Sequence, residues 1–203
     1  MSGGGLRQSQ KAATRQRVLT AARELFSNGG YEAATIRQIA QLAGVSVGSV
    51  FTTFSSKGEI LSQVMAERLE ALYAELDERI ARTQGSTAER LRAMFAVHFN
   101  FEFGHVQLFL AHIAAAYDAT LAFSASPYGR NLRLQAVIRE CLAEGVRRGD
   151  VRPDADLKAV VDLLMAAYAW TYRLAAWENA TAVTMIAVMD QQIGLIAQGF
   201  QPR

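Results

Sequence analysis

Hydrophobic residues recur every three to four positions along nearly the whole chain, which is the spacing of an α-helix with one buried face. The first helix that this pattern predicts covers residues 15–28 and stops at Gly29-Gly30. Two shorter helices follow within residues 35–54. From there the pattern predicts helices at residues 57–84, 88–103, 106–123, 127–148, 155–178 and 182–200. No alternation typical of strands interrupts the series, so the sequence predicts an all-α fold of about nine helices.

The segment TIRQIAQLAGVSVGSVFTTF, residues 35–54, has the spacing of two short helices that cross at a tight turn. Ala40 is small enough to admit the second helix, and Gly44 can take the positive φ that the turn requires. Val50, six residues further on, fills the angle between the helices. This spacing is typical of a DNA-binding helix-turn-helix, whose second helix enters the major groove.

The flanking residues extend this unit. Thr35 is a suitable N-cap for the first short helix, and Ser56 to Glu59 form a capping box that opens the next one. In this region the chain resembles the N-terminal domain of TetR-type transcriptional regulators, through Gly30-Tyr31, Ala34-Thr35, Ile39-Ala40, Ala43-Gly44-Val45-Ser46, Gly48, Phe51, Phe54, Ser56-Lys57 and Leu61. The resemblance implies a dimeric DNA-binding regulator, most often a repressor, whose variable C-terminal part encloses an inducer.

The charge distribution favours the same function. Residues 1–60 hold seven basic and three acidic side chains, whereas the remainder of the chain holds 14 and 16. The overall net charge of +2 therefore conceals a positive N-terminal part, where DNA phosphates would bind.

The second short helix has little to offer a base edge. It contains no Arg, Asn or Gln, so direct readout would depend on hydroxyl groups and on Val47 against a thymine methyl. By position, the resemblance makes Arg37 a reader of bases or phosphates and places Lys57 and the Thr35 hydroxyl on the DNA backbone. The complete predicted DNA-binding set is Thr35, Arg37, Gln38, Ser46, Val47, Gly48, Ser49, Thr52, Thr53 and Lys57.

At residues 51–53 the chain departs from the family pattern, because Phe51, Thr52 and Thr53 replace the longer polar groups that commonly grip phosphate. We therefore expect more of the affinity to come from Arg37, Lys57 and the basic N-terminal arm, and more specificity from DNA shape. If a dimer neutralises about six phosphates, log K falls with log salt at a slope of about −5.

An aromatic segment with all three histidines lies in the middle of the chain. Aromatic residues at helical spacing usually form a core, yet polar groups near apolar walls are also typical of a ligand cavity. The predicted ligand-binding residues are Phe95, His98, Phe99, Glu102, Phe103, Phe109, His112, Tyr117, Tyr168 and Tyr172. They indicate a mostly apolar or aromatic small molecule. A metal site on the histidines is disfavoured because Gly104 interrupts their helix, and no cofactor is indicated.

The last two predicted helices are apolar on two sides, so each needs two partners. One side can cover the domain core and the other can pair with a second copy as a two-fold four-helix bundle. The predicted dimer interface comprises Leu157, Val161, Leu164, Tyr168, Ile186, Met189, Ile193 and Ile196. Complete burial within a large monomer is the alternative.

These patterns divide the chain into a disordered basic arm (1–12), a helix-turn-helix domain (13–58) and a helical ligand-binding and dimerisation domain (59–203). A single cysteine excludes an internal disulfide, and no apolar run is long enough for a membrane span or signal peptide, so we expect a cytoplasmic protein. The predicted partners are a palindromic operator in double-stranded DNA, a small-molecule inducer and a second copy of the chain.

Two other functions were compared with this one. Gly44 to Gly48 match the G-x-S-x-G pattern of hydrolases, but that pattern needs a strand before the serine, and here a helix precedes it. An enzyme is therefore not expected. A helical adaptor that binds other proteins would explain the aromatic content but not the basic N-terminal part.

Overall fold

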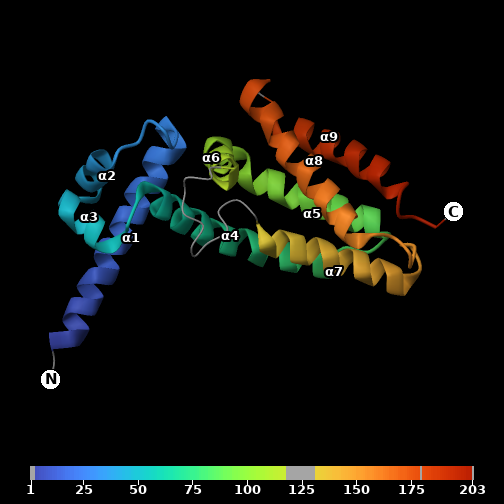
Figure 1. Ribbon diagram of the computed structural model, residues 1–203, viewed down its shortest axis with the longest axis horizontal. Helices are drawn as coiled ribbons and strands as arrows, with labels where there is room; N and C mark the ends of the chain where they lie inside the picture. Colours follow the sequence, from blue (N-terminus) through green and yellow to red (C-terminus); the bar gives the residue numbers. More distant parts are fainter. Residues whose placement is uncertain (1–2, 118–130, 179, 203) are drawn as a thin grey trace. The chain divides into compact units, whose positions relative to one another are not determined.

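The computed structural model confirms the all-α fold and describes residues 3–117, 131–178 and 180–202 (Figure 1). No strand occurs in these ranges. The helices are α1 (Gly3–Gly29), α2 (Ile36–Ala43), α3 (Val47–Thr53), α4 (Lys57–Arg82), α5 (Thr87–Glu102), the 3₁₀ helix η1 (Phe103–His105), α6 (Val106–Tyr117), α7 (Leu132–Arg148), α8 (Leu157–Trp177) and α9 (Ala182–Ala197). None of the helices searched is both long and apolar enough to cross a membrane.

The N-terminal helices form a compact bundle in which α1, α2 and α3 pack on one another. The buried side chains include Val18, Phe26, Ile39 and Val50, each with no exposed surface. An ion pair between Arg23 and Glu67 joins α1 to the first half of α4. The helix-turn-helix therefore rests on a small hydrophobic core of its own.

Residues 3–12 belong to α1, although the sequence analysis assigned them to a disordered arm. Most residues between Leu6 and Ala13 favour a helix. They extend towards the N-terminus the part of α1 whose residues pack in the core. Residues 8–13 are exposed, so this extension does not contribute to the core.

A second bundle comprises the later part of α4 with α5, α7, α8 and α9. Helix α5 packs on α7 and α9, and α8 packs on the same two helices. At one end Asp150 accepts a hydrogen bond from the Thr87 backbone N–H, and Gly145 leaves room for Thr87, whose Oγ1 would lie 2.1 Å from a Cβ added at this glycine. Close contact between α5 and α7 thus depends on a missing side chain.

Two compact units emerge, Met1–Leu69 with Gln107–Gly129 and Glu70–Val106 with Arg130–Arg203. The limit between them falls inside α4, whereas the sequence analysis placed it at residue 58. The sequence marks where a helix begins, but α4 continues past the first bundle into residues of the second.

Candidate nucleic-acid interface and ligand site

The turn between α2 and α3 is built as the sequence predicts. Thr35 caps α2, and its Oγ1 accepts the Gln38 backbone N–H at 3.2 Å. Gly44 closes α2 in the left-handed region with φ +64°, a conformation that a side chain would strain. Ala40 and Val50 are both buried where the two helices cross.

The side-chain oxygens of the second helix are already engaged within the protein. The Thr52 hydroxyl donates to the Gly48 carbonyl at 2.8 Å, and the Thr53 hydroxyl donates to the Ser49 carbonyl at 3.0 Å. Ser46 Oγ caps α3 and lies 2.9 Å from Ser49 Oγ. A hydroxyl whose proton is held by a backbone carbonyl cannot at the same time donate to DNA.

Lys57 has a structural role that the sequence analysis did not foresee. Its Nζ donates to the carbonyls of Tyr31, Ala34 and Glu32 at 2.9, 3.1 and 3.4 Å, and it lies 4.2 Å from the centre of the Tyr31 ring. The ammonium group thereby holds the loop between α1 and α2. Contact with a phosphate would compete with these bonds, so the DNA role of Lys57 stays a prediction.

The other two predicted residues of α2 differ in availability. Gln38 Oε1 accepts from the Thr35 backbone N–H at 2.9 Å and from its hydroxyl at 2.8 Å, which completes a capping box. Arg37 is exposed, as are Lys11 and Arg17 on α1. These exposed cations are the groups of the first unit best suited to contact phosphates.

Six of the ten predicted ligand residues come together in the second unit around α5 and α8. The rings of Phe95, Phe99 and Tyr172 lie 5.4, 5.6 and 5.1 Å from that of Tyr168, centre to centre. His98 and Glu102 are fully buried in the same region. Polar and aromatic side chains are thus buried together in one cluster.

His98 is the polar residue at the centre of this cluster. Its Nδ1 lies 3.2 Å from the Tyr168 hydroxyl, while its Nε2 has no hydrogen-bond partner among the described residues. Burial lowers the pKa of His98 from 6.5 to about 3, so the imidazole is neutral. Burial likewise raises the pKa of Tyr168 well above its ordinary value, with a further contribution from the neighbouring Tyr172.

Tyr73 of α4 also belongs to this cluster, although it was not among the predicted ligand residues. Its ring lies edge-on to His98 at 5.8 Å, and its hydroxyl donates to Asn131 Oδ1 at the start of α7. Burial raises the pKa of Tyr73. Its place in an apolar stripe with the buried Leu72 and Leu76 predicts a core residue, so the sequence offers no signal for its hydroxyl.

Four predicted ligand residues are not part of this cluster. Phe103 lies in η1 and is 42% exposed, because α5 ends just before it. Phe109 is buried but belongs to the first unit. The side chains of His112 and Tyr117 lie outside the described residues.

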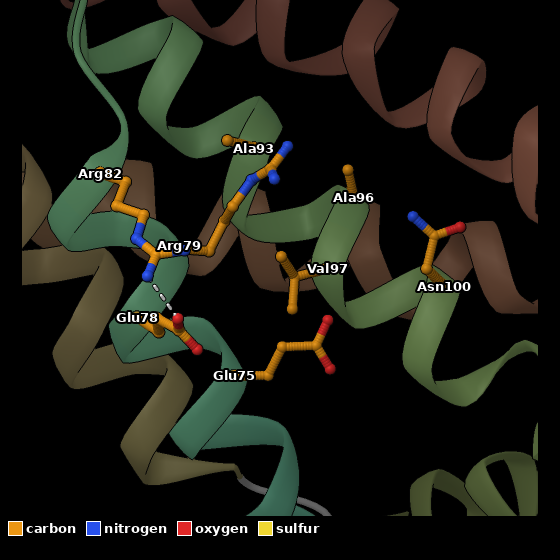
Figure 2. A pocket seen from close by; sticks show the side chains of 8 residues that line it. All are labelled: Glu75, Glu78, Arg79, Arg82, Ala93, Ala96, Val97 and Asn100. Atoms are coloured by element: carbon orange, nitrogen blue, oxygen red, sulfur yellow. Dashed lines mark ion pairs between the residues drawn. The ribbon is translucent and has the colours of Figure 1, made fainter.

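A surface pocket of about 300 Å³ lies between the end of α4 and α5 (Figure 2). Arg79, Arg82, Glu75 and Glu78 line one side, and a 2.7 Å ion pair joins Arg82 to Glu78. The other side consists of Ala93, Ala96, Val97 and Asn100. The two positive and two negative groups balance, and the pocket shares no residue with the predicted ligand site.

Most of the predicted dimer-interface residues are already buried within the single chain. Val161, Leu164, Tyr168, Met189 and Ile193 are at most 2% exposed in a single chain, because the helices of their own unit cover them. Only Leu157, Ile186 and Ile196 retain partial exposure. The apolar residues that α8 and α9 leave open are Leu163, Trp170, Val183 and Leu195, which are 52 to 76% exposed.

The three-helix bundle, its glycine turn and the exposed cations define a DNA-binding helix-turn-helix protein. Residues 18–64 match the family described as bacterial regulatory proteins, tetR family. The repressor KstR2 of Mycolicibacterium smegmatis is 31% identical over 153 residues, which cover 75% of this chain and 74% of KstR2. The chain belongs to the TetR family of transcriptional regulators. This family consists of regulators, which supports the expectation that the protein is not an enzyme.

Solved structures share the fold over nearly the whole length. Thermus thermophilus FadR, a TetR-family repressor in complex with lauroyl-CoA, is 25% identical with a TM-score of 0.74, covering 93% of this chain and 96% of FadR. Bacillus subtilis FadR in complex with stearoyl-CoA is 18% identical with a TM-score of 0.75, covering 91% of this chain and 98% of that one. The likeness therefore extends through the second unit, beyond the helix-turn-helix.

Proposed function

We propose that the protein is a transcriptional repressor that binds a palindromic operator as a homodimer and is released by a small, mostly apolar molecule. The helix-turn-helix and the exposed cations support the DNA part. The likeness to the repressor KstR2, which extends well past the DNA-binding domain, supports repression.

The observation that carries the ligand part is the Nε2 of the fully buried His98, which has no hydrogen-bond partner in the part of the chain that the structure describes. Buried polar groups are nearly always hydrogen-bonded, and an exception requires an explanation. A carbonyl or hydroxyl group of a ligand whose apolar part lies against Phe95 and Phe99 would supply the missing partner. Thermus thermophilus FadR is in complex with lauroyl-CoA, whose acyl chain is apolar although its coenzyme A part is charged, so a fatty acyl chain is the apolar group to test first.

Dimerisation would use the open faces of α8 and α9. Leu163 and Trp170 are seven residues apart on α8, and Leu195 is exposed on α9. Large exposed apolar side chains on two packed helices suit a two-fold four-helix bundle with a second copy. Such a dimer would present two reading heads to the two halves of a palindrome.

Helix α4 supplies residues to both units, so it is the element through which a ligand would act on the DNA-binding head. A ligand that binds only to a dimer whose helix-turn-helix domains have the wrong spacing for the operator must weaken DNA binding. Linkage then requires DNA to weaken ligand binding by the same factor.

The test is retardation of DNA from the region flanking the protein's own gene. We expect one palindromic fragment to be retarded in the presence of excess unrelated DNA. A helical adaptor would retard no fragment specifically, and that result would contradict the DNA part of the proposal.

Thermal unfolding tests the ligand site separately. Lauroyl-CoA should raise the unfolding temperature of the wild-type protein and have little effect on His98→Leu, whereas coenzyme A alone should affect neither. An equal shift in both proteins would show that His98 does not contact the ligand.

A further inference from the structure

We propose that α3 reads its operator through two apolar side chains, Val47 and Phe51, which contact the C5 methyl groups of thymines in the major groove. The inference rests on the DNA-binding part of the proposed function. It adds Phe51 as a residue that determines specificity and replaces hydroxyl readout by apolar readout.

Val47 and Phe51 form one exposed patch on the helix-turn-helix. They are four residues apart on α3 and therefore share a face, and they are 39% and 56% exposed. The residues that α3 turns inward, Val50 and the C-cap Phe54, are at most 1% exposed. The fold thus has its own aromatic and aliphatic core residues here and leaves Val47 and Phe51 to an outside partner.

Most of the hydroxyl protons on α3 are used within the helix. The hydroxyl protons of Thr52 and Thr53 are held by backbone carbonyls, and the two serine hydroxyls lie against each other at the N-cap. The helix contains no Arg, Lys, Asn or Gln. In the major groove the one apolar feature that distinguishes a base pair is the thymine methyl, so an apolar helix face selects thymine.

Gly48 lies between Val47 and Phe51 in the sequence and, because it has no side chain, adds no bulk to this surface. A Cβ added here would meet nothing closer than Ser46 Oγ at 3.8 Å, and the backbone φ is not positive. Nothing among the described residues therefore requires glycine at this position, although glycine weakens a helix. Close approach of DNA to the backbone explains its presence.

The experiment compares thymine with deoxyuridine, which lacks only the methyl group. A duplex is selected from a random pool with the full-length wild-type protein and resynthesised with deoxyuridine at each thymine in turn. We expect one or two positions in each half-site where loss of the methyl weakens binding about fourfold, the effect of one buried methyl group. Symmetric replacement in both half-sites should weaken binding about fifteenfold.

Variants assign the methyl contacts to residues. Val47→Ala should bind equally to the two duplexes that differ at the thymine contacted by Val47. Phe51→Ala should do the same at the thymine contacted by Phe51. Leu42→Ala is the matched control, because Leu42 is a 48% exposed apolar residue on α2, and it should keep the full difference. Thermal unfolding of each variant verifies that it is folded.

Three results would overturn the inference. Equal binding of thymine and deoxyuridine duplexes by the wild-type protein would exclude methyl readout while leaving DNA binding intact. A difference that persists in both Val47→Ala and Phe51→Ala would place the methyl contact elsewhere. Failure of the pool to yield any enriched duplex would contradict the DNA-binding function as well.

Discussion

Two glycines of the helix-turn-helix differ in what they do for the protein. Gly44 has a φ of +64°, so the turn itself depends on glycine. Gly48 has room for a side chain in the free protein. The turn thus requires glycine at position 44, whereas at position 48 we expect only DNA binding to require it.

Alanine at each position should separate these demands. We expect Gly44→Ala to lower the free energy of unfolding by about 1 kcal/mol or more, because alanine is strained at that φ. Gly48→Ala should leave stability unchanged or raise it by up to about 1 kcal/mol, yet weaken operator binding. Urea unfolding and operator titration of both variants check this. Undiminished DNA affinity in Gly48→Ala would show that DNA does not approach the backbone there.

His98 should give the protein a distinct dependence on pH. Its pKa is 6.5 in its ordinary state and about 3 in the folded protein, so below pH 6.5 the unfolded chain takes up a proton that the folded chain refuses. Stability is therefore lost as the pH falls from 6.5 towards 3, by up to about 1.4 kcal/mol per pH unit.

The variant His98→Leu lacks this proton uptake. Its free energy of unfolding, measured in urea between pH 7 and pH 4.5, should decline less steeply than that of the wild type. Parallel curves for the two proteins would mean that His98 is protonated in the folded state.

At the scale of the elements, the loop between α1 and α2 depends on a cation from the start of α4. Lys57 bonds three carbonyls of that loop, while Arg37 on α2 is exposed. We therefore expect Lys57 to contribute mainly to stability and Arg37 mainly to DNA affinity, although the sequence predicts a DNA contact for both.

Neutral substitutions should separate the two residues. We expect Lys57→Met to lower the free energy of unfolding by about 1–3 kcal/mol, the value of hydrogen bonds to a charged group, and to leave the salt slope of operator binding unchanged. Arg37→Gln should change stability by no more than about 0.5 kcal/mol and reduce the slope by about 1 per head. If Lys57→Met also reduces the salt slope, Lys57 contacts a phosphate and the expected division of roles is wrong.

The sequence predicts the helix-turn-helix well because its determinants are local. Thr35, Ala40, Gly44 and Val50 act through capping, size and φ within twenty residues, and the structure bears out each of them. The engagement of the Thr52 and Thr53 hydroxyls is also local, but it depends on the rotamer, which no residue pattern reveals.

The sequence does not show which face of α8 and α9 is covered within the chain. Periodicity shows that these helices are apolar on two faces, but only the packed fold shows that Val161, Leu164 and Met189 lie on the inner one. Periodicity also does not reveal partners distant in the sequence, such as Tyr73 for His98 or the loop carbonyls for Lys57.

For the whole molecule, the proposed dimer requires the outer face of α8 and α9. Leu163→Glu combined with Leu195→Glu should give a folded monomer in sedimentation, because charge on an exposed face harms association more than folding. The monomer should bind a full palindrome far more weakly. Ala187 is an exposed residue of α9, and Ala187→Glu tests how far this face extends. A dimer that survives the double change would place the interface elsewhere.

In the proposed function, ligand binding at the buried cluster around His98 is coupled to DNA binding by the helix-turn-helix. The most direct test is fluorescence anisotropy of the labelled operator duplex, titrated with full-length protein at fixed salt, with and without saturating lauroyl-CoA. We expect the ligand to weaken operator binding about 5- to 150-fold and the operator to weaken ligand binding by the same factor. Operator affinity that is identical with and without bound lauroyl-CoA would contradict it.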